Sequence, residues 1–165
     1  MARIRRIVIP NIPHHITQRG VRSMNIFFKH EDYQYYKELL YFQERFYSTP
    51  LDDIHFLYAI RYVEQNPVKA YMVKYPWDYK YSSARYRMNK ELEDKLLSNY
   101  EPIDKIVNYK EFLQENTQTK LIQEKTKTGK PCGDTDFYDK IKLLTGIDYK
   151  NKKPGPKVEN DFKNN

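Results

Sequence analysis

The chain has 165 residues, of which 39% are hydrophobic and 15% aromatic, and it carries a formal net charge of +7. This length allows one compact domain, or a small domain with an appendage. The only cysteine, Cys132, excludes an intrachain disulfide framework. Because no apolar run is long enough to span a bilayer and no signal-type segment opens the sequence, we expect a cytoplasmic protein without a membrane partner.

Positive charge gathers at both ends of the sequence. The first 30 residues contain no acid, and their basic residues are Arg3, Arg5, Arg6, Arg19, Arg22 and Lys29. From residue 150 onward five lysines stand against two acids, and the stretch between the ends is near neutral. Basic ends around a neutral centre predict contacts with a polyanion such as nucleic acid. The alternative is that both ends are solvated tails.

The first predicted elements are a strand and a helix. Residues 12–18 contain β-branched residues in imperfect alternation, which predicts a strand. Residues 31–46 predict a helix, because Glu31 and Asp32 supply negative charge to its first turn. Its expected apolar stripe consists of Tyr35, Leu39, Phe42 and Phe46, supported by Tyr36 and Leu40.

A second helix is predicted from about residue 53, capped by Asp52 or Asp53, and Pro67 predicts its end near Asn66. Its expected apolar stripe is Phe56, Ala59, Ile60 and Val63. Tyr62 and Asn66 are four residues apart and therefore share the other face, together with His55 and Tyr58. A phenol beside an amide oxygen fits a nucleophile next to a metal ligand. The alternative is a half-packed tyrosine and an asparagine at a helix end.

The second half of the sequence predicts short helices. Asn108 with Glu111 forms a capping-box-like start for one helix, and two more are expected at 118–127 and 134–145, with Gly146 as a C-terminal cap. Two helices around a glycine-bearing turn resemble a helix-turn-helix. We expect this part to have a core of its own, formed by Ile106, Phe112, Leu121, Ile122, Phe137, Ile141 and Leu144.

The predicted organisation has four segments. Residues 1–88 form a first domain, 89–100 a charged linker, 101–149 the C-terminal helical module, and 150–165 a basic tail that we expect to be disordered.

Several sequence words resemble one family. R-Y-V-E-Q-N-P-V-K-A closely resembles the R-Y-I-E-L-N-P-V-R-A signature of the REP-associated, insertion-sequence-200-like tyrosine transposases of the HUH superfamily. H-I-T-Q-R-G and T-K-T-G-K-P-C-G are similar to the family's V-T-x-R-G strand end and its T-R-T-G-R-P-L-G turn. In that family the tyrosine attacks a DNA phosphate, and the residue at the asparagine position helps to hold Mg²⁺ or Mn²⁺. The resemblance therefore implies a catalytic role for Tyr62 and a metal-binding role for Asn66.

The resemblance also exposes a gap. In the family, a strand carrying two histidines follows the first helix, then a long helix and a further strand. Here residues 44–48 run directly into T-P-L-D-D, which resembles the later strand before the tyrosine helix. The junction is similar to an internal deletion that removes the histidine pair.

The four histidines do not replace that pair in the sequence. His14 and His15 are adjacent, so on a strand they point to opposite faces and cannot chelate one ion together. His55 lies two turns before Tyr62 and could approach a metal there. We expect Mg²⁺ or Mn²⁺ not to be bound tightly, and the isolated protein not to cleave DNA.

The expected fold is α+β: a truncated ferredoxin-like domain, mainly helical, with a small antiparallel sheet from residues 12–18 and 45–51, plus the helix-turn-helix-like module. The expected function is transposase-like binding of single-stranded or hairpin DNA through Arg3, Arg5, Arg6, Arg19 and Arg22. Two alternatives stay open: cleavage with a site borrowed from an intact relative, and a non-catalytic nucleic-acid-binding or regulatory protein, at the extreme a decayed gene product. A homodimer is left open, because the helix stripes lose their sheet partner.

Overall fold

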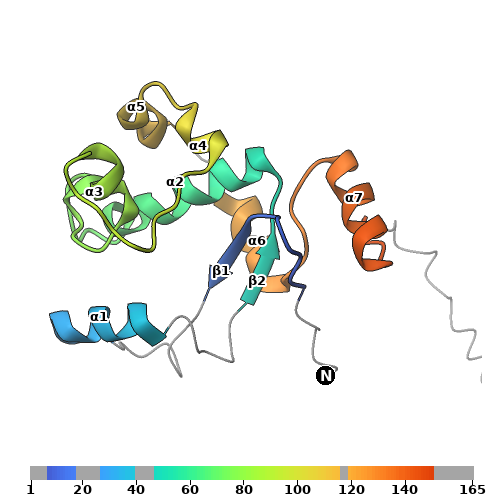
Figure 1. Cartoon of the computed structure of the whole chain (residues 1–165), viewed down its shortest axis with the longest axis horizontal. Coiled ribbons are helices and arrows are strands. Elements are labelled where there is room, and N and C mark those ends of the chain that lie inside the picture. The colour runs from blue at the N-terminus through green and yellow to red at the C-terminus, as the bar shows by residue number, and fades with distance from the viewer. Residues whose placement is uncertain (1–6, 18–26, 40–46, 116–118, 151–165) are drawn as a thin grey trace, which may run out of the picture.

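The computed structural model describes residues 7–17, 27–39, 47–115 and 119–150, except for the side chains of residues 37–39 and 119 (Figure 1). The fold is α+β, with about half of the described residues in helices and one small antiparallel sheet, as the sequence predicts. Its elements are β1 (His14–Thr17), α1 (His30–Leu39), β2 (Tyr47–Pro50), α2 (Asp53–Lys69), the 3₁₀-helix η2 (Pro76–Asp78), α3 (Ser83–Met88), α4 (Glu101–Asp104), α5 (Tyr109–Gln114), α6 (Thr119–Thr128) and α7 (Thr135–Thr145). Among the described residues, no helix has the length and apolar character needed to cross a bilayer.

The sheet consists of β1 and β2, which pair antiparallel with His14 opposite Pro50 and Thr17 opposite Tyr47. The predicted pairing of residues 12–18 with 45–51 is therefore confirmed. Two strands alone are marginally stable in water. Here the chain around Cys132 extends the ladder, because its backbone N–H donates to the Pro50 carbonyl at 2.9 Å and its carbonyl accepts from the Asp52 N–H at 3.2 Å.

Helix α2 begins where the sequence predicts and ends later. Asp52 is its N-cap and accepts a hydrogen bond from the His55 backbone N–H at 2.7 Å. The expected end near Asn66 is wrong, because α2 continues through Pro67 to Lys69. Proline removes only the one hydrogen bond to the carbonyl of Val63, near the C-terminal end of the helix.

The buried face of α2 also differs from the expected apolar stripe. Ala59 is buried as predicted, but Val63 is 44% exposed. Two charged side chains, Arg61 and Glu64, are buried instead. The reason is the position of the helix: α2 runs through the middle of the fold and packs on β1, η2, α4, α5 and α6, so several of its faces are covered (Figure 1).

Three clusters of buried residues form the core, and each one joins distant parts of the chain. The first contains Ile7, Ile9, Phe137 and Ile141; the second contains Leu51, Ala59, Ile122 and Cys132; the third contains Ala84, Phe112 and Leu113. The expectation of a separate core for the C-terminal helices is therefore wrong. Their buried side chains fill three clusters with residues from the first half, and Leu144 is 56% exposed.

Helix α1 begins near the predicted residue, and the expected continuation to residue 46 lies outside the described residues beyond 39. Of its expected apolar stripe, Tyr35 is the member whose side chain the structure describes, and it is 65% exposed. The helix touches the rest of the fold through rings: Tyr33 stacks on Tyr81 with 3.8 Å between centroids, and Phe27 stacks on Tyr33 at 4.4 Å. Figure 1 shows α1 to one side of the other elements.

The predicted signals of the later helices are confirmed. Asn108 caps α5 by accepting from the Glu111 N–H at 3.1 Å, and Asp134 caps α7 by accepting from the Phe137 N–H at 2.8 Å. Gly146 ends α7 in the left-handed conformation, at φ 70°. Helix α6 packs on α2 and β2, whereas Phe137 and Ile141 of α7 pack on residues near the N-terminus.

Candidate functional site

Tyr62, the candidate nucleophile, lies on α2 above the small sheet. Its half-buried ring packs on the second core cluster, and its edge meets the His15 ring with 6.3 Å between centroids and 81° between planes. Within the described part of the chain, the Tyr62 hydroxyl has no hydrogen-bond partner. The phenol is therefore placed by ring packing and not by a polar network.

Asn66 and Lys69 follow Tyr62 along the same face of α2, at helical positions i+4 and i+7. Asn66 is exposed. The ammonium group of Lys69 lies 5.5 Å from the centroid of the Tyr62 ring, and partial burial lowers the pKa of Lys69. The lysine ammonium group beside the ring attracts anions such as phosphate. The sequence interpretation missed Lys69, although its position seven residues after Tyr62 predicts that both lie on the same face of the helix.

The two adjacent histidines do point to different surroundings. His15 is buried beside Tyr62, and its Nε2 has no hydrogen-bond partner among the described residues. The Nδ1 of His14 contacts the Ser48 hydroxyl at 2.7 Å, and its Nε2 lies 3.2 Å from both backbone atoms N and O of Ile9. Burial lowers the pKa of both imidazoles, so each is favoured in its neutral form. Strand alternation predicted this separation but not which histidine would face Tyr62.

His55, which the sequence left open as a metal ligand, is bound to a carboxylate instead. Its Nδ1 contacts Asp52 Oδ1 at 2.7 Å. The hydrogen bond to Asp52, followed by the nearby Cys132 sulfur, raises the pKa of His55 to about 10 against the effect of burial. Asp52 also accepts from the Asp134 N–H at 2.9 Å. This group joins the end of β2, the start of α2 and the turn after Cys132, so its evident role is structural.

The remaining residues of the signature word serve packing on another face of α2. Arg61 donates to Glu115 Oε2 at 2.6 Å and lies over the Phe112 ring at 4.3 Å. Glu64 accepts hydrogen bonds from the Ser83 hydroxyl and, at 2.8 Å, from the Tyr109 hydroxyl. Burial raises the pKa of Glu64, although both hydrogen bonds and Arg87 oppose that shift. Arg61 and Glu64 therefore hold α3 and α5 against α2.

The donor set around Tyr62 does not fit the family's metal. Mg²⁺ prefers several oxygen ligands, and Asn66 offers one neutral amide oxygen. Within the residues that the structure describes, no three His, Cys, Asp or Glu side chains lie close enough together to hold a metal ion. We therefore derive no step through a metal at this site.

The predicted DNA contacts Arg3, Arg5, Arg6, Arg19 and Arg22 all lie outside the described residues. What the structure brings together is a half-buried phenol, a neutral buried imidazole, a lysine over the phenol ring and an exposed amide. This group can attract a phosphate and present a phenol to it, but it contains no evident general base poised on the hydroxyl. No protein-family model, no curated protein and no solved structure matches the chain.

Proposed function

We propose that this chain is a DNA-binding protein derived from a tyrosine transposase, which binds single-stranded or hairpin DNA and does not cleave it alone. The observation that carries the proposal is the signature word R-Y-V-E-Q-N-P-V-K-A together with the acid-free basic leader that precedes it. A phosphate-binding role needs only the arginines and lysines that the sequence supplies.

The surroundings of Tyr62 support a phosphate-facing surface. Lys69 lies over the Tyr62 ring and Asn66 is exposed beside it, so an incoming phosphate would meet a cation and an amide on one face of α2. Polar groups of this kind commonly position a nucleic-acid backbone without reading its sequence.

The proposal that cleavage is lost rests on the same groups. A tyrosine phenol ionises near pH 10 and is a weak nucleophile at neutral pH, so the family depends on a metal that polarises the phosphate. The family's histidine pair has no counterpart in the sequence, and Asn66 alone is a poor Mg²⁺ site. Cleavage with a site borrowed from an intact relative, and assembly as a homodimer, are the alternatives that the sequence leaves open.

DNA binding is tested by fluorescence anisotropy with a labelled single-stranded hairpin at increasing salt. For single strands, each phosphate contact contributes about 0.7 to the slope of log K against log salt. We expect Arg3→Ala, Arg5→Ala and Arg6→Ala together to weaken binding and to flatten that slope. The charge-matched control replaces three exposed lysines on the other elements, Lys74, Lys105 and Lys110, by alanine. Equal losses for both triples would show that net charge alone drives binding.

Cleavage is tested by incubating the protein with the same hairpin and Mg²⁺ or Mn²⁺, followed by a denaturing gel. We expect no covalent adduct. An adduct that disappears on Tyr62→Phe would show that the chain is an active nuclease. An adduct that forms only when an intact family member with a disabled tyrosine is added would support the borrowed-site alternative. If the wild-type chain does not bind DNA at all, both the proposed function and the borrowed-site alternative are rejected.

A further inference from the structure

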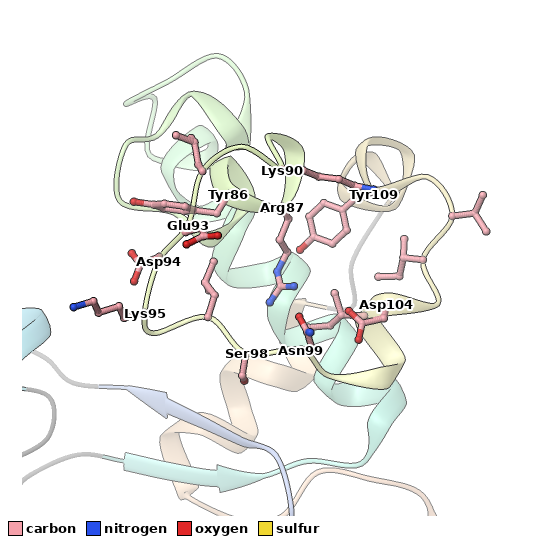
Figure 2. A pocket seen from close by; sticks show the side chains of 15 residues that line it. Tyr86, Arg87, Lys90, Glu93, Asp94, Lys95, Ser98, Asn99, Asp104 and Tyr109 are labelled. Carbon is pink, nitrogen blue, oxygen red and sulfur yellow. The ribbon is translucent and has the colours of Figure 1, made fainter.

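A pocket of about 920 Å³ lies on the far side of α2 from the sheet, between α3, the segment 90–99, α4 and the start of α5 (Figure 2). Leu97, Ile103 and Ile106 supply apolar lining, and Ser98 and Asn99 supply neutral polar groups. A volume of this size is typical of small-molecule sites. None of the residues proposed for DNA binding or cleavage lines this pocket.

Arg87 is the central charged group of the pocket. Figure 2 shows its side chain extending from α3 into the pocket, between Tyr109 and Asn99. Its Nε is buried and has no hydrogen-bond acceptor among the described residues. The nearest carboxylate oxygen is Glu64 Oε1, at 3.9 Å, which is an ion-pair distance but too long for a hydrogen bond.

The carboxylate of Glu64 is already committed to other partners. It accepts from the Ser83 and Tyr109 hydroxyls, which fix its position. Burial raises the pKa of Glu64, which weakens the negative charge facing Arg87. Among the described residues, the Nε–H at one edge of the planar guanidinium fork therefore lacks an acceptor, and the guanidinium also lies 6.0 Å from the centroid of the Tyr109 ring. Carboxylate and phosphate groups match that fork.

The rest of the lining selects between these anions. Two further cations, Lys90 and Lys95, line the pocket, which favours a group of higher charge than a carboxylate. Glu93 and Asp104 line it as well, and such acceptors suit amino and hydroxyl donors on the same ligand. A ligand that combines a phosphate, a flat apolar ring and polar edge donors is a nucleotide.

We propose that this pocket binds a nucleotide 5′-phosphate, with Arg87 holding the phosphate. The nucleotide can be free in solution or the 5′ end of a single strand. Both sources present the same chemistry to Arg87. The proposal does not rest on DNA binding by the basic leader, because the pocket and the leader share no residue.

The test is calorimetric titration of the full chain with dAMP, and separately with inorganic phosphate and with deoxyadenosine. We expect saturable binding of dAMP that is at least tenfold tighter than binding of either half. Arg87→Gln should weaken dAMP binding at least tenfold. The control Arg85→Gln, at an exposed position of the same helix, should leave it unchanged. No saturable binding of dAMP, or phosphate binding as tightly as dAMP, would overturn the proposal.

Arg87 also faces buried Glu64, so its variant is checked for folding by circular dichroism. Leu97→Trp is the second variant, because it narrows the pocket without touching the Arg87–Glu64 pair. Loss of dAMP binding in Leu97→Trp supports the site even where Arg87→Gln unfolds, and retained binding rejects it. Two oligonucleotides, one with a 5′-phosphate and one without, distinguish the two sources. A site for strand ends binds the phosphorylated oligonucleotide more tightly than the other. A site for free nucleotides binds neither oligonucleotide.

Discussion

Two faces of the same helix, α2, carry residues of one sequence word but have different roles. On one face, Tyr62, Asn66 and Lys69 lie at the edge of the fold, where the tyrosine is held mainly by ring contacts. On the other face, Arg61 and Glu64 are buried and hydrogen-bonded to α3 and α5. The more constrained polar groups lie on the face to which the family resemblance assigned no role.

This difference teaches that a signature word records folding as well as chemistry. A buried carboxylate with two hydroxyl donors is expensive to disturb, because every change leaves polar groups without partners. A half-buried phenol with an unbonded hydroxyl tolerates change easily. If the protein has lost the ability to cleave DNA, the buried contacts of Arg61 and Glu64 alone would still favour retention of much of the sequence R-Y-V-E-Q-N-P-V-K-A. The following predictions test this contrast, from the largest expected effect to the smallest.

Glu64→Ala is expected to destabilise the fold most. It removes the buried ion-pair partner of Arg87 and leaves the Ser83 and Tyr109 hydroxyls without their acceptor, which typically costs about 3–5 kcal/mol. The measurement is the free energy of unfolding from urea titration. Glu91→Ala, at an exposed position, is the control and should change it by less than about 0.5 kcal/mol. A loss below about 1 kcal/mol for Glu64→Ala would contradict the structural role of this face.

Asp52→Ala is expected to have the next largest effect. It removes the N-cap of α2 and the acceptor of the Asp134 N–H, and loss of a cap alone typically costs about 0.5–2 kcal/mol. Helical content and urea unfolding measure the change. Asp136→Ala, in the first turn of α7 and exposed, controls for the loss of one negative charge. Similar losses for both variants would show that Asp52 acts only through its charge.

The Asp52–His55 pair also predicts a pH dependence. The folded pKa of His55, about 10, lies above its ordinary value of 6.5, so the folded state favours the protonated imidazole. Its stabilising contribution is complete below pH 6.5 and is lost as the pH rises toward about 10. The difference in unfolding free energy between wild type and His55→Gln should therefore shrink across this window. A difference that stays constant with pH would contradict the raised pKa of His55. The same measurement on Cys132→Ser would show how much the neighbouring sulfur contributes to that pKa.

Tyr62→Phe is expected to have the smallest effect on stability, within about 0.5 kcal/mol, because no described residue bonds the hydroxyl. Urea unfolding of this variant beside Glu64→Ala measures the contrast between the two faces directly. A loss above about 1 kcal/mol would reveal a hydroxyl contact that holds the ring in place.

Local signals in the sequence predicted the elements well. Asp52, Asn108, Asp134 and Gly146 each mark a helix end, since a cap acts on backbone groups within a few residues. The pairing of β1 with β2 was also predictable. The end of α2 was not, because a proline near the C-terminal end of a helix removes one hydrogen bond without breaking the helix. The shared core was missed since contacts between distant helices leave no local pattern.

The candidate site was predictable only in part. Spacing placed Tyr62 and Asn66 on one face, but it could not reveal that His15 would meet the ring from the sheet. The burial of Arg61 and Glu64 runs against hydrophobic periodicity, which assigns charged residues to water. Arg61 and Glu64, whose aromatic neighbours Phe112 and Tyr109 lie on α5, become buried only when that helix packs on α2.

The first core cluster has a consequence for the synthesis of this protein. Ile7 and Ile9 are buried against Phe137 and Ile141, roughly 130 residues later in the chain, so this cluster closes a very long loop. A ribosome releases the N-terminus long before α7 exists, and until then the two isoleucines have no partner in that cluster. The sheet and α2 can form earlier, and docking of α7 becomes the late event that seals the N-terminal segment. A chain that stops before α7 would keep this apolar segment exposed to aggregation and to proteases.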